Sequence, residues 1–166
     1  MKYALGLTLC VLAAPLAALD AQRGAVTVTA VVTGLDEPWA VAPMPDGGLL
    51  VTERDGALQL IRDGRATKVR GVPRVAASGQ GGLLDITLAR DFASTRTLFL
   101  TYSKPQGRGA GTALAAAELS ADGSRLVNVR DLFESAPGGT GGRHYGSRVV
   151  EARDGGEELL DGDDAV

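Results

Sequence analysis

Cysteine is almost absent from this sequence. The one cysteine, Cys10, lies in an apolar stretch at the amino terminus. If that stretch is removed on export, the mature chain has neither a disulfide nor a thiol, which excludes disulfide-built scaffolds and cysteine catalysis. An exported protein without disulfides has to be stabilised by its apolar core or by a bound ligand.

A surplus of basic residues is also missing, and so are further long apolar runs. Lys and Arg total 17 against 20 Asp and Glu, a formal net charge of −3, so no broad basic surface for nucleic acid is expected. No second long apolar run follows the amino-terminal one, so we expect no membrane span in the mature chain. The carboxylates lack calcium-loop or zinc-ligand spacing, and the sequence predicts no metal site.

The amino-terminal stretch has the order of an export signal. Lys2 supplies a charge, Tyr3–Leu19 is a mostly apolar run, and small residues follow up to Ala21. This order predicts a signal peptide over residues 1–21 and a periplasmic or secreted protein. The alternative is a membrane anchor, but the run is near the lower length limit for a span and Pro15 interrupts it.

Glycine, by contrast, is abundant. The 23 glycines are about twice the usual share, which suits a protein with many tight turns. Asp-Gly pairs favour hairpin turns, because glycine adopts positive φ easily and Asp hydrogen-bonds its own backbone. Such pairs recur along the chain, among them Asp46-Gly47, Asp55-Gly56, Asp63-Gly64, Asp122-Gly123 and Asp154-Gly155.

Short strands are predicted between these turns, and no stretch shows a sustained helical period. A first set of four is predicted at Trp39–Met44, Gly48–Arg54, Ala57–Arg62 and Ala66–Val72. A second set of four is predicted at Leu83–Ala89, Thr97–Ser103, Thr112–Ser120 and Leu126–Glu134, and a third set begins at Ser147–Glu151. The alanine-rich run at 112–120 is interpreted as a strand because turn signals flank it. The pattern predicts an all-β fold, either propeller blades, which repeat every ~40–50 residues, or a β-sandwich.

Two residues are candidates for a functional role because of the chemistry of their side chains. His144, the only histidine, lies in the glycine-rich stretch Gly138–Arg148, and histidine suits proton transfer near neutral pH. Gln80 lies in Ser78–Leu84, and its amide can donate to and accept from an oxygen-rich ligand. The alternative interpretations are a surface-loop histidine without a role and an ordinary turn before a strand.

Three further residues stand out by position. Arg143 and Arg148 flank the histidine and could hold an anionic cofactor through charge-assisted hydrogen bonds, or they could be solvated loop residues. Trp39, the only tryptophan, is expected to pack in the core at the start of the first strand set.

An ordered series of segments resembles the glucose/sorbosone dehydrogenase family, the soluble aldose dehydrogenases that use pyrroloquinoline quinone (PQQ). The match runs from about Val31 to Val150. Its segments are Gly34–Met44, Pro45–Arg54, Gly71–Val75, Gly79–Asp91, Phe92–Ser103 and His144–Val150.

The resemblance implies a six-bladed propeller, of which residues 22–150 would supply about two and a half blades. It implies PQQ at the end of the central channel, an aldose substrate and an external electron acceptor. His144 would be the general base that removes the proton from the anomeric hydroxyl, and Gln80 would lie at the cofactor and the sugar. Asp163 would hold His144 in position. Calcium ligands are expected in later blades.

The carboxyl-terminal stretch departs from the family pattern. Residues 155–166 are acidic and lack the β-branched and aromatic residues of the family's next strand. We therefore expect residues 151–166 to be a truncated or aberrant tail and the chain to be an inactive amino-terminal fragment. Two other functions stay open at this point: a propeller binding module without chemistry, and a metal-dependent lactonase, which would need converging carboxylates.

Overall fold

The computed structural model describes residues 20–21, 24–25, 27–152 and 157–161. The chain divides into two compact units, Met1–Val31 and Val32–Val166. In the first unit the backbones of β1 (Asp20–Ala21) and β2 (Gly24–Ala25) pair antiparallel. The predicted export signal lies almost wholly outside the described residues. Within the described part, none of the helices has the length and apolarity needed to span a bilayer.

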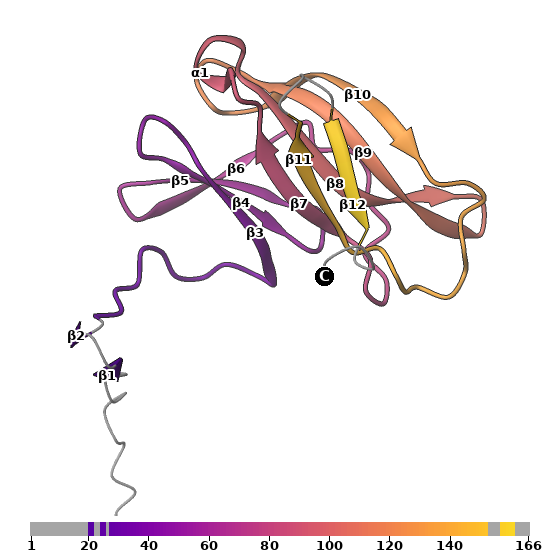
Figure 1. Cartoon of the computed structure of the whole chain (residues 1–166), viewed down its shortest axis with the longest axis horizontal. Helices are drawn as coiled ribbons and strands as arrows, with labels where there is room; N and C mark the ends of the chain where they lie inside the picture. Colours follow the sequence, from indigo (N-terminus) through magenta and orange to yellow (C-terminus); the bar gives the residue numbers. More distant parts are fainter. Residues whose placement is uncertain (1–19, 22–23, 26, 153–156, 162–166) are drawn as a thin grey trace, which may run out of the picture. The chain divides into compact units, whose positions relative to one another are not determined.

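The second unit begins with a four-stranded antiparallel sheet, as predicted (Figure 1). Its strands follow one another in chain order and are joined by the Asp-Gly hairpins. They are β3 (Pro38–Pro43), β4 (Leu49–Glu53), β5 (Leu58–Arg62) and β6 (Arg65–Val69).

The Asp-Gly turns have the chemistry that the sequence predicts. The carboxylates of Asp46, Asp55 and Asp122 each accept a hydrogen bond from the backbone N–H two residues later, at 3.1, 3.1 and 3.0 Å. The glycines that follow them have φ values of +83°, +106° and +72°. Local turn chemistry therefore sets the register of these hairpins. The pair Asp154-Gly155 lies outside the described residues.

A second four-stranded antiparallel sheet follows, in which strands that are consecutive in the chain pair with each other. A single helical turn, α1 (Phe92–Thr95), connects its first two strands. The alanine-rich run forms a strand, as predicted, and pairs with a neighbour on both sides. The strands are β7 (Leu83–Leu88), β8 (Thr97–Gln106), β9 (Gly109–Leu119) and β10 (Leu126–Glu134).

The third set consists of β11 (Ser147–Glu151) and β12 (Glu157–Asp161), which pair antiparallel. β11 lies against β7 and β8 of the second sheet (Figure 1). The expectation that the acidic stretch 155–166 lacks strand structure is wrong for Glu157–Asp161. A ladder with β11 supplies the backbone partners there, and strand formation depends more on such context than on composition.

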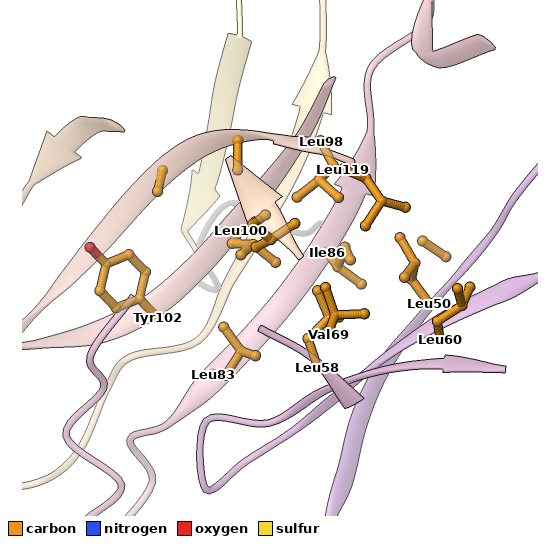
Figure 2. Packing of buried hydrophobic residues seen from close by; sticks show 14 of the residues in the cluster. Leu50, Leu58, Leu60, Val69, Leu83, Ile86, Leu98, Leu100, Tyr102 and Leu119 are labelled. Carbon is orange, nitrogen blue, oxygen red and sulfur yellow. The ribbon is translucent and has the colours of Figure 1, made fainter. Parts of the chain in front are cut away.

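The main core lies between the first and second sheets. Leucines of β4 and β5, Leu50 and Leu58, belong to the same buried cluster as Leu83, Leu98 and Leu100 of β7 and β8. Figure 2 shows these side chains meeting between the two sheets. The two sheets are therefore packed face to face, and each covers the apolar face of the other.

The opposite face of the second sheet is also covered. Phe99 of β8 and Ala116 of β9 belong to a second cluster that includes Val149 of β11. Their chain neighbours Leu98 and Ala115 belong to the main core. The period of two along β8 and β9 thus separates two buried faces, which explains why apolar side chains follow one another directly in both strands.

Trp39 does not pack in the core, so that expectation is wrong. Trp39 is 50% exposed to solvent, and Val41 on the same strand is also exposed. Ala42 is part of the main core, and Ala40 packs against it. Because side chains alternate along β3, the alanines take the core face and the tryptophan takes the other.

Candidate functional site

The loop that carries His144 connects β10 to β11 and is tied to β9. Gly139 donates its N–H to the carbonyl of Ala110 at 2.9 Å, and Ala110 donates back to Gly139 at 3.0 Å. Further along the loop, the ring of Tyr145 is buried in a small cluster with Leu84 and Ala110. The exposed His144 therefore sits between two anchored points.

The loop before β7 brings Gln80 to this histidine. Gln80 donates its backbone N–H to the carbonyl of Gly142 at 2.8 Å. Its side-chain Oε1 accepts a hydrogen bond from the backbone N–H of His144 at 2.9 Å. Both residues are exposed. The structure thus joins two residues that are 64 positions apart in the chain, and leaves the two N–H donors of the Gln80 amide for other partners.

Glycine is required where the two loops meet. Gly79 has φ +61°, and a Cβ at this position would lie 2.3 Å from the carbonyl oxygen of Gly142. That distance is far below van der Waals contact, so a side chain here would push the loops apart. The glycine-rich sequence is therefore what allows Gln80 and His144 to approach each other.

A shallow polar hollow of about 160 Å³ lies beside this contact, and Arg143 and His144 are part of its lining. His144 has φ +63°, in the left-handed region. That conformation is uncommon for residues other than glycine, although histidine adopts it more often than most. The surrounding hydrogen bonds hold it.

The remaining predicted site residues have different surroundings. Arg143 is exposed, and no ion pair involves it in the part of the chain that the structure describes. The guanidinium of Arg148 is 73% exposed and lies 3.5 Å from the carboxylate of Asp85. Asp163 lies outside the described residues, so its predicted contact with His144 stays a prediction.

Sequence reasoning missed Asp85, which is only 2% exposed. Its Oδ2 accepts a hydrogen bond from the backbone N–H of Val149 at 3.2 Å, and its Oδ1 faces Arg148. It therefore attaches β11, which follows the histidine loop, to β7. The sequence did hold a signal for it, since Asp85 lies within an apolar predicted strand. A carboxylate buried in such a strand almost always has a partner.

Sequence reasoning also missed Arg54 and Glu37. Arg54 Nη1 donates to the carbonyls of Gly79 and Gly81, at 3.1 and 3.3 Å, on either side of Gln80. Glu37 accepts from Arg54 Nη2 at 2.7 Å. These contacts depend on the approach of β4 to the loop before β7, and the only sequence signal was that Arg54 ends a segment matching the family.

The next question is whether the site could bind a metal ion. Among the residues that the structure describes, no group of three or more His, Cys, Asp or Glu side chains converges on one point. The loops join the Gln80 amide to the backbone of His144, and Arg143 and His144 line the hollow beside that contact. Such a set can accept a proton and donate hydrogen bonds to an anionic, oxygen-rich ligand.

The fold and the site together define an all-β protein. Its candidate functional residues, Gln80 and His144, lie on glycine-rich loops before β7 and β11. Comparison with known proteins identifies the group more narrowly. Residues 35–161 match the family model for glucose/sorbosone dehydrogenase. The chain belongs to the glucose/sorbosone dehydrogenase family, as its sequence segments predicted.

Similar proteins support the assignment. Aldose sugar dehydrogenase YliI of Escherichia coli (strain K12) is 42% identical over 137 residues, which cover 80% of this chain and 37% of that protein. A solved glucose dehydrogenase is 40% identical with a TM-score of 0.69, covering 74% of this chain and 39% of that one. The PQQ-bound aldose sugar dehydrogenase of Streptomyces coelicolor is 29% identical with a TM-score of 0.68, covering 78% of this chain and 39% of that one. This chain therefore spans less than half the length of each.

Proposed function

We propose that this chain supplies the amino-terminal blades of a PQQ-dependent aldose dehydrogenase with a six-bladed propeller. The proposed reaction oxidises the anomeric hydroxyl of an aldose to a lactone, with an external electron acceptor. The observation that carries the proposal is the contact between Gln80 and His144, because Gln80 Oε1 accepts the His144 N–H at 2.9 Å. Family relatives that are dehydrogenases of aldoses or glucose support it.

The residues around this contact fit an anionic quinone. Glycine at position 79 lets the two loops touch, since a Cβ there would lie 2.3 Å from the carbonyl oxygen of Gly142, and this keeps Gln80 against the backbone of His144. Arg143 offers a guanidinium beside the hollow, and Arg148 has N–H donors in addition to those that face Asp85. We propose that these two arginines hold the cofactor, and the PQQ-bound state of a relative supports PQQ as that cofactor.

His144 is proposed to accept the proton of the anomeric hydroxyl. Removing that proton favours transfer of a hydride from the anomeric carbon, because the negatively charged oxygen can then form the lactone carbonyl. PQQ, when bound, supplies the acceptor for the hydride. The amide N–H groups of Gln80 would orient a sugar or cofactor oxygen, since its Oε1 already holds the His144 backbone.

Other parts of the proposal rest on the family resemblance and the sequence alone. These are the orientation of His144 by Asp163, calcium ligands in later blades and export through residues 1–21. We also propose that the 166 residues by themselves do not turn over sugar. They align with 37% of the length of the Escherichia coli relative.

A dye-reduction assay tests the proposal in the protein expressed from its complete gene, with PQQ, calcium and a panel of aldoses. Wild type is expected to reduce the dye. The variants His144→Ala and His144→Asn are expected to lose about 10²–10⁴-fold in kcat, the usual contribution of a general base. Asn is included because it tolerates the left-handed φ at this position, which separates loss of the base from loss of loop geometry.

The control is Arg62→Met, which removes an exposed ion pair with Asp46 at 2.5 Å. Its turnover is expected to equal that of wild type. Unchanged turnover in both His144 variants would remove the histidine from the mechanism. A wild-type protein that neither binds PQQ nor reduces the dye would overturn the proposed function, and lactone hydrolysis in its place would indicate the lactonase alternative.

A further inference from the structure

We infer that the ion pair between Glu37 and Arg54 is a positioning device for His144 that acts through the Gln80 loop. Among the hydrogen bonds of the described residues, none joins Glu37 or Arg54 to His144, so the inference concerns positioning residues and not catalytic ones. Its consequence for turnover rests on the proposed function, whereas its consequence for the loops does not.

The first step is that Arg54 forms hydrogen bonds to the loop that carries Gln80. Its Nη1 donates to the carbonyls of Gly79 and Gly81, at 3.1 and 3.3 Å. Its own backbone carbonyl accepts the N–H of Leu83 at 3.1 Å. A Cβ on Gly82 would lie 2.1 Å from that carbonyl oxygen. Arg54 therefore holds the segment on both sides of Gln80 through its side chain and its backbone.

The second step fixes the guanidinium itself. Glu37 Oε2 accepts from Arg54 Nε at 3.1 Å and from Nη2 at 2.7 Å, while the Glu37 carbonyl accepts the Arg54 N–H at 3.1 Å. The segment of Glu37 is fixed in turn, because the buried Glu53 accepts the N–H of Asp36 at 2.6 Å. A planar guanidinium can face a carboxylate and two carbonyls together, which an ammonium cannot do with the same geometry.

The third step connects the loop to the histidine. Gln80 donates its N–H to Gly142, and His144 donates its N–H to Gln80 Oε1. A Gln80 loop that moves would therefore release the backbone of His144. A second pair in the same sheet, Arg62 with Asp46, has the same charges and a more exposed arginine, yet its hydrogen bonds lie away from the loop. This pair provides a matched control.

The test compares Arg54→Met, Arg54→Lys and Glu37→Gln with Arg62→Met by NMR and by turnover. The imidazole signal of His144 is identified as the one that disappears in His144→Asn. In Arg54→Met the amide exchange of Gln80 and His144 is expected to accelerate at least tenfold, and the imidazole signal to shift. Arg54→Lys and Glu37→Gln are expected to be intermediate, and Arg62→Met to match wild type.

In the PQQ-loaded protein, Arg54→Met is expected to lower kcat at least tenfold, with partial rescue in Arg54→Lys. Wild-type amide exchange and an unshifted imidazole signal in a folded Arg54→Met would overturn the inference. If Arg54→Met does not fold, Glu37→Gln decides by the same criteria. Lack of turnover in wild type would count against the proposed function alone, since the NMR comparison still reports whether the ion pair positions His144.

Discussion

Gly79 and Gly107 have nearly the same backbone conformation but different surroundings. Their φ values are +61° and +56°, yet a Cβ on Gly79 would lie 2.3 Å from a carbonyl oxygen of Gly142, whereas a Cβ on Gly107 would meet nothing within 4 Å. The left-handed conformation costs about 1–2 kcal/mol in any residue with a Cβ. The clash is an extra cost at Gly79 alone.

We therefore expect Gly107→Ala to lower the free energy of unfolding by about 1 kcal/mol and Gly79→Ala to lower it by at least twice as much. Only Gly79→Ala should change the imidazole NMR signal of His144. Urea denaturation and NMR of both variants measure these effects. Equal losses of stability with an unchanged imidazole signal would show that the loops can separate without consequence for the site.

At the scale of the element, β9 shows why this alanine-rich run is a strand. Ala115 belongs to the main core, and Ala116 belongs to the cluster on the opposite face. Ala115 is opposite Leu100 of β8 and Asp131 of β10. Small side chains on both faces allow the neighbouring sheets to pack closely, so the composition reflects packing and not helix propensity.

Enlarging Ala115 should therefore be costly. Ala115→Leu is expected to lower the free energy of unfolding by about 1–3 kcal/mol, because a fully buried position has no room for three more carbons. The matched control is Ala66→Leu on β6, where the alanine is exposed and a change within about 0.5 kcal/mol is expected. Similar urea midpoints for the two variants would contradict close packing around β9.

At the scale of the whole molecule, the phenol of Tyr102 is expected to contribute to the loss of stability above pH 10. Tyr102 is buried in the main core and donates to Asp131, which also pairs with Lys104. Burial, and then the hydrogen bond to Asp131, raises the pKa of Tyr102 above its ordinary value of 10. The folded state thus keeps the proton longer than the unfolded state. This contribution to stability is complete below pH 10 and is lost as pH rises further.

The free energy of unfolding of wild type should consequently fall by about 1 kcal/mol more than that of Tyr102→Phe between about pH 9 and pH 11. Urea denaturation at both pH values measures the difference, and comparison of the two proteins removes the contribution of other groups that titrate there. Parallel pH profiles would show that the phenol ionises equally readily in the folded and unfolded states.

The predictable part of the fold and site was local or compositional. Asp-Gly pairs set the hairpins, and the two-residue period set the strands and their grouping into sheets. Gln80 and His144 could be singled out one by one, from residue type and glycine context. The contribution of Asp85 could have been suspected, because a carboxylate in a buried strand requires a partner.

The rest was decided by packing between segments that are distant in the chain. The face of β3 that Trp39 occupies, the ladder that makes a strand of Glu157–Asp161, and the reach of Arg54 to the Gln80 loop depend on which sheet lies against which. The sequence by itself determined the turns, the strands and the family. Only the tertiary structure decided how Gln80 and His144 meet, because a hydrogen bond across 64 residues forms only after the sheets have packed.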